Sequence, residues 1–339
     1  MIIEPATDQR LWDDFLTSQP FSPFLQSWTM GEVYRDIGQE PIRLWARDET
    51  DIHAICQGIV VPARRGKHVM VQYGPIISDK RVANSEKLLE DLLHALRKIA
   101  REKNCSFIRM SPFWSEQNTI PIIGAKSSPL HLLAEHIWYL PLTGKTEDEI
   151  FKNMRSTTRN LIRRAEKEGV TIECSCDPIR DVEEFIRLHD ETRKRHKFVP
   201  YSNAFFRAQV GHFAPSQNVL VYLARFQGRV IAASIHMQFG GETSYHHGAS
   251  SHEFSKIPAS YLLQWTAIRD ALRRGDTIYN FWGIAPSQSK NHPFAGVTLF
   301  KTGFGGQLLN LMHCIDLPLR KTYYVTRAFE YVRKWKRGF

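Results

Sequence analysis

The chain has 339 residues, enough for two domains of ordinary size, and its composition of 42% hydrophobic, 12% aromatic and 24% charged residues is typical of a globular protein. It contains no run of about 18 apolar residues that could span a membrane, and residues 1–5 have neither the basic start nor the apolar core of a signal peptide. The net charge of +10 and the pI of about 9.4 favour a polyanionic partner such as RNA, a nucleotide or an anionic lipid.

The first half of the chain predicts two short helices followed by a strand meander. Residues 8–16 form an apolar face from Leu11, Trp12 and Phe15, and residues 24–34 predict a second helix. Strands are expected at 42–47, 52–61 and 68–73, the last ending at Gly74. An amphipathic helix at 85–103 and a buried strand at 105–110 complete this half.

The second half repeats this order. A helix at 181–196 precedes strands at 219–226, 230–239 and 243–247, a helix at 259–274 and a strand at 277–284. Asp8 corresponds to Asp181 and Gly74 to Gly248, an offset of about 173 residues. The repeat implies two similar domains, at 1–143 plus 319–339 and at 144–318, with a cleft between them as the default ligand site. The strand order resembles the GCN5-related (GNAT) acyltransferase fold, a mixed α/β class of α+β type.

Residues 146–169 predict one basic helix between the domains. Thr146 and Glu149 form a capping box, and Gly169 is the expected stop. Five basic residues spaced three or four apart share one face: Lys152, Arg155, Arg159, Arg163 and Lys167. Arginine forks on such a face are candidates for phosphate binding. The alternative is a solvated basic face, balanced in part by Glu166 and Glu168.

A single lysine, Lys301, lies among aromatic residues and glycines at 296–306, after the apolar strand end at 280–285. An ammonium group there must be paired, solvated or directed at an anionic ligand, because an unpaired buried charge is costly. The alternative is a lysine that reaches solvent from a glycine-punctuated hairpin.

Five stretches together resemble the FemABX family of peptidoglycan interpeptide-bridge aminoacyltransferases. They are Asn153–Val170, Tyr245–Ser250, Ala259–Trp265, Tyr279–Ile284 and Phe300–Phe304. The resemblance implies transfer of an amino acid from aminoacyl-tRNA to an amine of a peptidoglycan precursor. We expect the chain to act as a monomer with no metal and no bound cofactor. Residues 163–170 leave no room for the family's coiled-coil arm, so the chain resembles the short form, in which the C-terminal segment packs on the first domain.

The resemblance also implies the site residues. Lys301 corresponds to the lysine held to stabilise the developing oxyanion, a role whose loss costs about 10²–10³ in rate, and Phe300 accompanies it. The candidate substrate contacts are Trp28, Arg155, Arg159, Arg163, Tyr201, Tyr245, His247, Tyr279 and Trp282.

Three positions depart from the short-form pattern. Glu32 and Tyr201 stand where a lysine and an arginine grip a muramyl nucleotide, and His247 replaces a tyrosine. Either the acceptor differs, for instance a lipid-linked precursor, or other basic residues take over the phosphate. The candidates for that replacement are Arg35, Arg64, Arg65 and Lys67.

Two other functions remain open. An acyl-CoA-dependent N-acetyltransferase has the same fold, but residues 250–258 contain no glycine for a pyrophosphate loop. A non-catalytic RNA-binding protein would explain the charge but not Lys301. The five cysteines are scattered and no histidine cluster completes a metal site, so we expect reduced thiols, a cytoplasmic protein and no metal.

The tail at 319–337 is basic and aromatic. It could act as an interfacial helix at an anionic inner membrane face, which would suit a lipid-linked acceptor. We favour the alternative, in which its aromatic residues pack on the first domain and its lysines are solvated.

Overall fold

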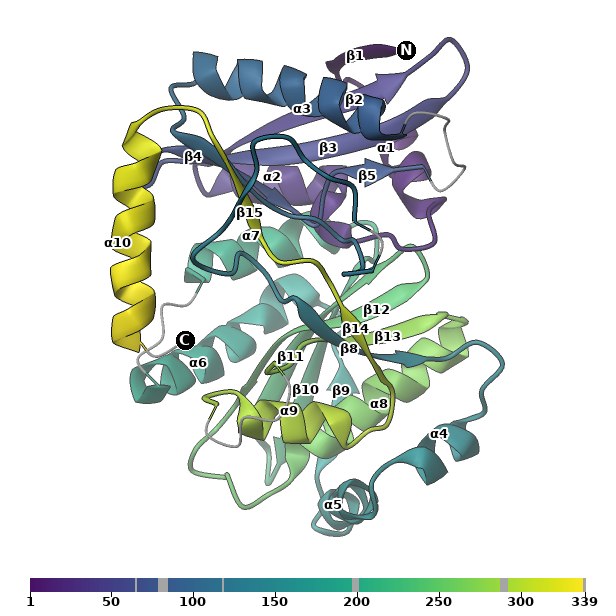
Figure 1. Ribbon diagram of the computed structural model, residues 1–339. Helices are drawn as coiled ribbons and strands as arrows, with labels where there is room; N and C mark the ends of the chain where they lie inside the picture. The colour runs from purple at the N-terminus through teal and green to yellow at the C-terminus, as the bar shows by residue number, and fades with distance from the viewer. Residues whose placement is uncertain (65, 79–84, 118, 197–200, 287–291, 338–339) are drawn as a thin grey trace. The chain divides into compact units, whose positions relative to one another are not determined.

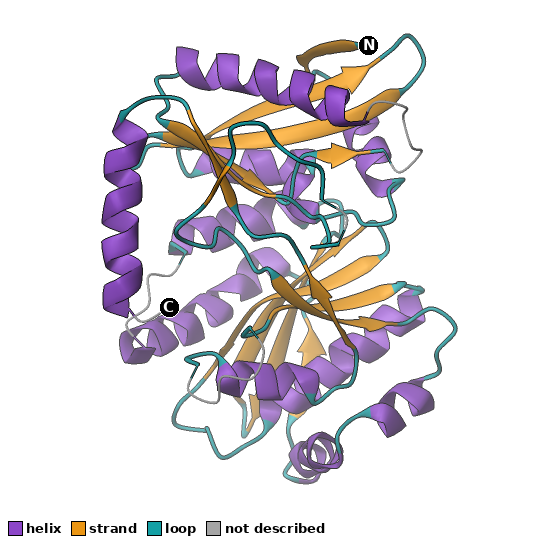
Figure 2. Cartoon of the chain, in the orientation of Figure 1, coloured by secondary structure: helices purple, strands orange, loops and turns teal. Residues whose placement is uncertain are grey.

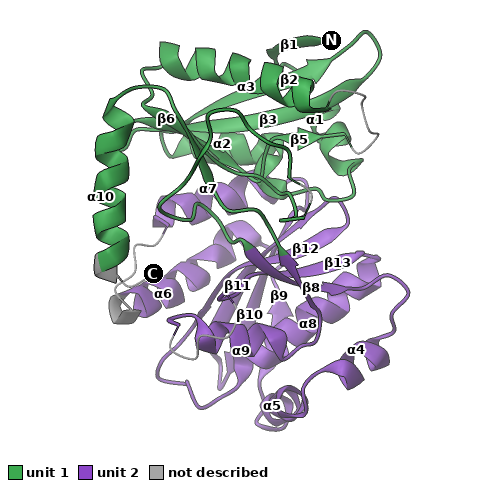
Figure 3. Cartoon of the chain, viewed as in Figure 1, with its two compact units in different colours: residues 1–135, 310–339 green, residues 136–309 purple. Residues whose placement is uncertain are grey.

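The computed structural model describes residues 1–64, 66–78, 85–117, 119–196, 201–286 and 292–337 (Figure 1). Contacts divide the chain into two compact units, unit 1 with residues 1–135 and 310–339, and unit 2 with residues 136–309 (Figure 3). The boundaries expected from the sequence lay at 143/144 and 318/319. None of the helices in the described part of the chain is long and apolar enough to cross a bilayer.

Unit 1 is built on an eight-stranded sheet in the order β1-β2-β3-β4-β6-β15-β7, with β5 paired to β3 (Figure 2). The strands are β1 (Ile2–Pro5), β2 (Glu40–Arg47), β3 (Ile52–Val61), β4 (His68–Gln72), β5 (Ile76–Ile77), β6 (Phe107–Ser111), β7 (Lys126–Ser127) and β15 (Ile315–Pro318). The antiparallel meander β1–β4 is followed by the parallel pair β4/β6.

The helices of unit 1 are α1 (Gln9–Thr17), η1 (Phe24–Gln26), α2 (Trp28–Asp36), α3 (Ser85–Glu102) and α10 (Thr322–Arg337). The expected helix at 24–34 is a 3₁₀ turn followed by α2, because Ser27 accepts a hydrogen bond from Met30 N and caps a new helix. Trp12 and Phe15 are buried as expected, whereas Leu11 is 48% exposed.

Unit 2 repeats the pattern in a seven-stranded sheet, in the order β14-β8-β13-β12-β11-β10-β9. The strands are β8 (His136–Pro141), β9 (Thr171–Cys174), β10 (Val219–Phe226), β11 (Arg229–Phe239), β12 (Glu242–Ser250), β13 (Ile278–Gly283) and β14 (Gln307–Asn310). The meander β9–β12 is antiparallel and β12/β13 is parallel, so the predicted repeat is confirmed.

The helices of unit 2 are α4 (Glu147–Asn153), α5 (Ser156–Lys167), α6 (Pro178–His196), α7 (Asn203–Phe213), α8 (Ala259–Arg274) and α9 (Ala295–Thr302). The capping box of Thr146 and Glu149 is confirmed, but the single helix predicted at 146–169 is wrong. The backbone of Met154 is extended (φ −67°, ψ 152°), which ends α4 and lets its side chain enter the core of unit 2. Only three residues separate α5 from β9, so the chain has no arm there.

Candidate functional site

Strands β12 and β13 separate in the middle of the sheet of unit 2. They pair only from Glu242 to Ser244 and from Ile278 to Asn280. Beyond this point β12 carries a bulge, because Ile235 pairs with His247 and His236 with Tyr245, which leaves His246 as the extra residue. Beyond these residues β12 and β13 no longer pair, so the sheet of unit 2 has an opening near its centre.

Strand β13 turns at the same level. Trp282 has a φ of +66°, a conformation that costs energy for a residue with a side chain. Its N–H donates to Asn280 Oδ1 at 2.7 Å, and Asn280 Nδ2 donates to Glu242 at 2.9 Å. Burial raises the pKa of the Glu242 carboxyl. Glu242, absent from the predicted site, therefore fixes the asparagine that holds this turn.

Lys301 lies at this opening, on helix α9 rather than on a hairpin. Its Nζ donates to the carbonyl oxygen of Gly283 at 2.7 Å and lies 5.8 Å from the centre of the Tyr245 ring. The residue is 7% exposed, so it does not reach solvent as the alternative reading required. Burial lowers the pKa of Lys301 to about 7. No carboxylate among the described residues forms an ion pair with it, and such a cation is suited to binding an anion.

The end of α9 that carries Lys301 is held by α5. Arg155 N donates to Gly303 O at 2.9 Å, and the Arg155 guanidinium donates to Leu299 O at 3.2 Å and Thr302 Oγ1 at 3.3 Å. A positive charge at a helix C-terminus is also favourable for the helix dipole. An added Cβ at Gly303 would overlap Thr158 Oγ1, so only glycine allows this packing. Arg155 thus positions the lysine helix.

A pocket of about 330 Å³ opens beside Phe300, which precedes the lysine. Its walls come from β11, β12, the first two turns of α8 and helix α9, with Thr192 of α6. The lining residues with polar or aromatic side chains are Thr192, Ser234, Tyr245, Ser250, Ser260, Tyr261, Gln264 and Phe300. The first turn of α8 has no side-chain cap, but the N–H groups of Ala259 and Tyr261 donate to Ile257 O at 2.9 Å and to Pro258 O at 3.1 Å, so these two groups are not available to an anion.

The position of the Tyr245 side chain depends on a glycine at residue 248. An added Cβ at Gly248 would overlap the Tyr245 hydroxyl, and burial raises the pKa of this tyrosine to about 12. Tyr261 packs on Phe300 with ring centres 4.9 Å apart. Tyr261 was not part of the predicted site, and the sequence signal for it was its place in the family motif Ala259–Trp265, at the start of a predicted helix.

Tyr279 and Trp282, both predicted substrate contacts on β13, have different surroundings. Tyr279 is fully buried, its hydroxyl lies 2.7 Å from Gln264 Oε1 and 2.8 Å from His236 Nε2, and it does not line the pocket. The Trp282 ring meets His246 edge-on, with centres 4.8 Å apart. Burial, aided by the charge of Lys301, lowers the pKa of His246 to about 3, too low for a general base at neutral pH.

His247 and Tyr201 belong to an aromatic cluster with α6 and α7. The His247 ring lies 4.9 Å from Phe206 and 5.5 Å from Tyr201, which stacks on Phe205 at 4.2 Å. Burial first, and then the nearby His246 and His189, lower the pKa of His247. Neither His247 nor Tyr201 lines the pocket.

Two further arginines of the basic helix bind the chain itself. Arg159 Nη1 donates to Met154 O at 2.9 Å and to Lys152 O at 2.5 Å, satisfying carbonyls at the end of α4. Arg163 lies over the Phe151 ring at 5.2 Å. Because the break at Met154 puts Lys152 on α4, the five basic residues do not form one helix face.

Trp28 lies in unit 1, at the start of α2. The Arg43 guanidinium lies 4.0 Å above its ring and donates to Glu32 at 2.6 Å. Arg35 also pairs with Glu32. The carboxylate that replaces the expected lysine is therefore neutralised by two arginines, one of which, Arg43, the sequence analysis missed. Of the other proposed replacements, Arg64 and Lys67 are exposed and Arg65 lies outside the described residues.

Comparison with known proteins gives the family context. Residues 152–291 match the acetyltransferase (GNAT) domain family, and residues 7–126 match the FemAB family. Aminoacyltransferase FemA of Staphylococcus epidermidis is 19% identical over 420 aligned positions, covering 94% of this chain and 99% of FemA. The solved structure of FemX superposes with a TM-score of 0.82 at 17% identity, over 96% of this chain and 99% of FemX. The structure of a tandem GNAT protein from the clavulanic acid biosynthesis pathway superposes with a TM-score of 0.60 at 11% identity, over 94% of this chain and 98% of that protein.

These matches confirm the predicted fold of two GNAT-like domains and support the resemblance to FemABX proteins. The alignment with FemA has 420 positions, and 94% of 339 residues is about 319, so FemA has about 101 positions with no counterpart here. That difference agrees with the short form expected from the sequence.

Proposed function

We propose that this FemABX-type chain is an aminoacyltransferase that moves an amino acid from aminoacyl-tRNA to an amine of a peptidoglycan precursor. The observation that carries the proposal is the buried Lys301 ammonium, which has no carboxylate partner among the described residues, at the opening between β12 and β13. Family context supports an acyltransferase, and the sequence motifs support an aminoacyl donor.

Lys301 would act on the charge that develops during transfer. When the acceptor amine attacks the aminoacyl ester, the carbonyl oxygen becomes negative. An ammonium group has three N–H donors, and Gly283 O accepts one of them. A preorganised cation in a site with little water stabilises such an oxyanion far better than one in bulk solvent.

The bonds and protons balance without a cofactor. The amine nitrogen forms a bond to the carbonyl carbon, and the bond from that carbon to the ribose oxygen of the tRNA breaks. The proton lost by the amine goes to the ribose oxygen that leaves. We propose that a substrate group mediates this proton transfer, because His246 is too weakly basic and Glu242 is engaged by Asn280.

The pocket beside Phe300 would hold the donor end. Its aromatic residues Tyr245, Tyr261 and Phe300 offer stacking surfaces for an adenine or an apolar aminoacyl side chain. Acyl-CoA would present the same chemistry to these groups, so it is the competing donor. In unit 1, Arg35 has a side chain that is 57% exposed and stays a candidate for contact with the acceptor phosphate, whereas Arg43 is buried and bound to Glu32.

One experiment tests the proposal. A mixed pool of charged tRNA is offered with a soluble muramyl-pentapeptide nucleotide or its lipid-linked form, and label transfer is followed for the wild type and Lys301→Ala. Transfer to either acceptor that falls about 100-fold or more in the variant supports the proposal. No transfer to either acceptor, with binding of acetyl-CoA instead, would make the protein an acyl-CoA enzyme.

We also propose that the protein works in the cytoplasm, with α10 as a peripheral membrane contact. Our favoured reading of this helix was wrong for most of its aromatic residues. Tyr323 is buried, but a stripe is exposed along α10: Tyr324 52%, Val325 74%, Phe329 40%, Tyr331 49%, Val332 51% and Trp335 82%. Arg333 and Lys334 lie among them, and apolar residues with flanking basic residues are typical of helices that bind anionic lipid.

A further inference from the structure

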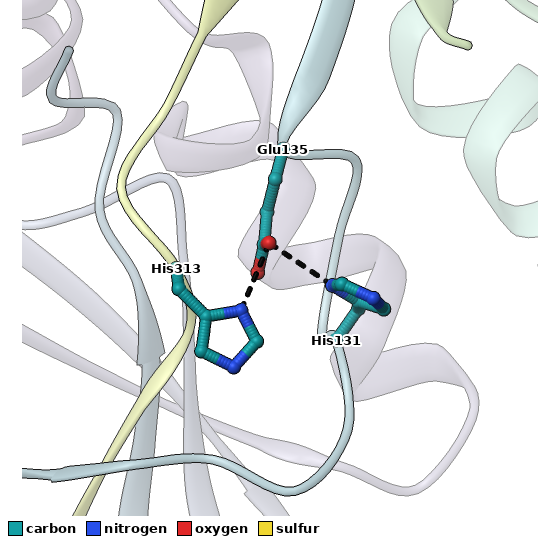
Figure 4. Close-up of side chains that lie close together, drawn as sticks. All are labelled: His131, Glu135 and His313. Atoms are coloured by element: carbon teal, nitrogen blue, oxygen red, sulfur yellow. Dashed lines mark hydrogen bonds and ion pairs between the residues drawn. The ribbon is translucent and has the colours of Figure 1, made fainter. Parts of the chain in front are cut away.

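In unit 1, two histidine rings meet at one carboxylate oxygen of a glutamate (Figure 4). Nδ1 of His131 lies 3.0 Å from Oε2 of Glu135, and Nδ1 of His313 lies 2.9 Å from the same oxygen. The three atoms all lie within 4.8 Å of one another. The proposed transfer reaction uses none of these residues.

The cluster joins two segments that are distant in the sequence. His131 and Glu135 precede β8, whereas His313 precedes β15. Leu311 N donates to Glu135 O at 2.8 Å, and Cys314 N donates to Glu135 Oε1 at 2.8 Å, so the backbone itself fixes the two segments around the glutamate. The sequence analysis excluded a histidine cluster because no local spacing shows one, and the fold corrects that expectation.

The hydrogen bonds around the cluster orient two of its atoms toward the shared centre. Nε2 of His313 lies 2.8 Å from the carbonyl oxygen of Ser128, a contact that requires a proton on Nε2. The lone pair of a neutral His313 is then on Nδ1, the atom that faces Glu135. Metal-binding histidines usually donate their second ring N–H to a carbonyl or a carboxylate in this way. Glu135 Oε1 is taken by Cys314 N, which leaves Oε2 for the centre.

The donor set selects a class of metal ion. Two imidazole nitrogens and one carboxylate oxygen suit Zn²⁺ and similar transition metals, whereas Ca²⁺ and Mg²⁺ prefer oxygen ligands throughout. Zn²⁺ bonds of about 2.0–2.2 Å separate the ligand atoms of a tetrahedron by about 3.4 Å, so the 2.9 and 3.0 Å contacts would open by about half an ångström. Glu135 is 7% exposed and the His131 side chain 57%, so an ion could enter from the His131 side and keep a water ligand.

We propose that unit 1 binds one divalent transition-metal ion of the Zn²⁺ class through His131 Nδ1, Glu135 Oε2 and His313 Nδ1. The ion fastens the segment before β8 to the segment before β15, next to the two points where the chain passes between unit 1 and unit 2. Its role is structural, and the proposal goes beyond the proposed transfer reaction.

Metal binding to the full-length, untagged chain tests this proposal. After chelator treatment, the protein is titrated with Zn²⁺ in competition with a chromophoric chelator, and with Co²⁺ to record its visible absorption bands. The expected result is one ion per chain, tetrahedral Co²⁺ bands and a Tm that rises with Zn²⁺ concentration by mass action.

Two variants and a matched control identify the ligands. His131→Ala removes a ligand whose side chain is largely exposed, so it should fold, and it should weaken Zn²⁺ binding at least tenfold and remove the Tm rise. Glu135→Gln should weaken binding as well, whereas His94→Ala, at an exposed position of α3, should leave binding unchanged. If the wild type binds no stoichiometric Zn²⁺, or His131→Ala binds as tightly as the wild type, the cluster is a hydrogen-bonded triad only. These outcomes do not depend on transferase activity.

Discussion

Lys301 donates from Nζ to the carbonyl oxygen of Gly283 at 2.7 Å, which links the end of helix α9 to the end of strand β13. The bond holds a cation where β12 and β13 have separated, in surroundings dry enough to lower the pKa of the lysine to about 7. Within the part of the chain that the structure describes, this charge has no carboxylate partner, so burying it lowers stability, and a transition state that develops negative charge would recover that free energy.

The first prediction is that Lys301 makes stability depend on pH. The pKa of Lys301 is about 7 in the folded chain and 10.5 for an ordinary lysine. Between these two pH values, Lys301 keeps its proton in the unfolded chain and has lost it in the folded chain. The free energy of unfolding should therefore rise with pH across this window, by at most about 1.4 kcal/mol per pH unit. Lys301→Met should be more stable than the wild type at pH 7 by ~2–4 kcal/mol, and this advantage should shrink toward pH 10.

Urea unfolding at several pH values measures the effect. Lys145→Met, at an exposed lysine in the same unit, serves as the control and should keep the pH slope of the wild type. A Lys301→Met variant that keeps that slope too would mean that the buried lysine is not the group responsible.

The second prediction concerns Gly248. An alanine Cβ there would overlap the Tyr245 hydroxyl, and overpacking of this kind typically costs about 1–3 kcal/mol. Gly248→Ala should lower the free energy of unfolding by that amount and displace a pocket residue, so transfer should fall as well. Gly211→Ala, on α7 with open space around it, should instead stabilise by about 0.5–1 kcal/mol. Equal effects of the two substitutions would argue against the close packing of Tyr245 on Gly248.

The third prediction concerns the attachment of α10. Arg109 donates to Asp316 at 2.7 and 2.9 Å and to Glu330 at 2.7 and 3.0 Å. Asp316 is fully buried, so Arg109→Met leaves an uncompensated charge and should cost about 3–5 kcal/mol. Lys87→Ala breaks the exposed pair with Asp91 and should cost less than about 1 kcal/mol. Thermal unfolding compares the two, and a cost for Arg109→Met as small as that for Lys87→Ala would contradict this reading.

Local patterns predicted the regular elements well. Helix α8 spans Ala259–Arg274 as expected, because its apolar spacing and Gly275 define both ends. The strand meanders of both units follow from alternating runs closed by turn residues. The predictions that were wrong, such as the single helix at 146–169, concerned features that depend on contacts between distant segments. No glycine or proline marks the break at Met154, since that break comes from burial of Met154 and the capping of α4 by Arg159.

The candidate site shows the same limit. The motif identified Lys301 and Phe300, but Gly296 and Gly303 suggested a hairpin, where the structure has helix α9. Nothing local indicated that Lys301 would be buried, or that Arg43 would neutralise Glu32, because both follow from side chains that meet only in the folded chain. The predicted contacts of Arg159, Arg163 and Tyr279 with substrate stay predictions.

The fourth prediction is that α10 binds anionic vesicles through its apolar stripe. Val325→Ser combined with Trp335→Ser should reduce cosedimentation with phosphatidylglycerol vesicles at least threefold, because two exposed apolar side chains no longer enter the interface. Ile123→Ser, at another exposed aliphatic residue of unit 1, is the control and should bind as the wild type does. Undiminished cosedimentation of the double variant would exclude this role for the stripe.

The most direct test of the central claim is kcat/KM for aminoacyl transfer by Lys301→Ala, compared with Lys145→Ala and the wild type. If the Lys301 ammonium stabilises the oxyanion, the value for Lys301→Ala falls by about 10²–10³, while its melting temperature stays at or above that of the wild type. The Lys145→Ala variant should transfer as the wild type does. A Lys301→Ala variant that is folded and transfers within a few-fold of the wild type would contradict the account.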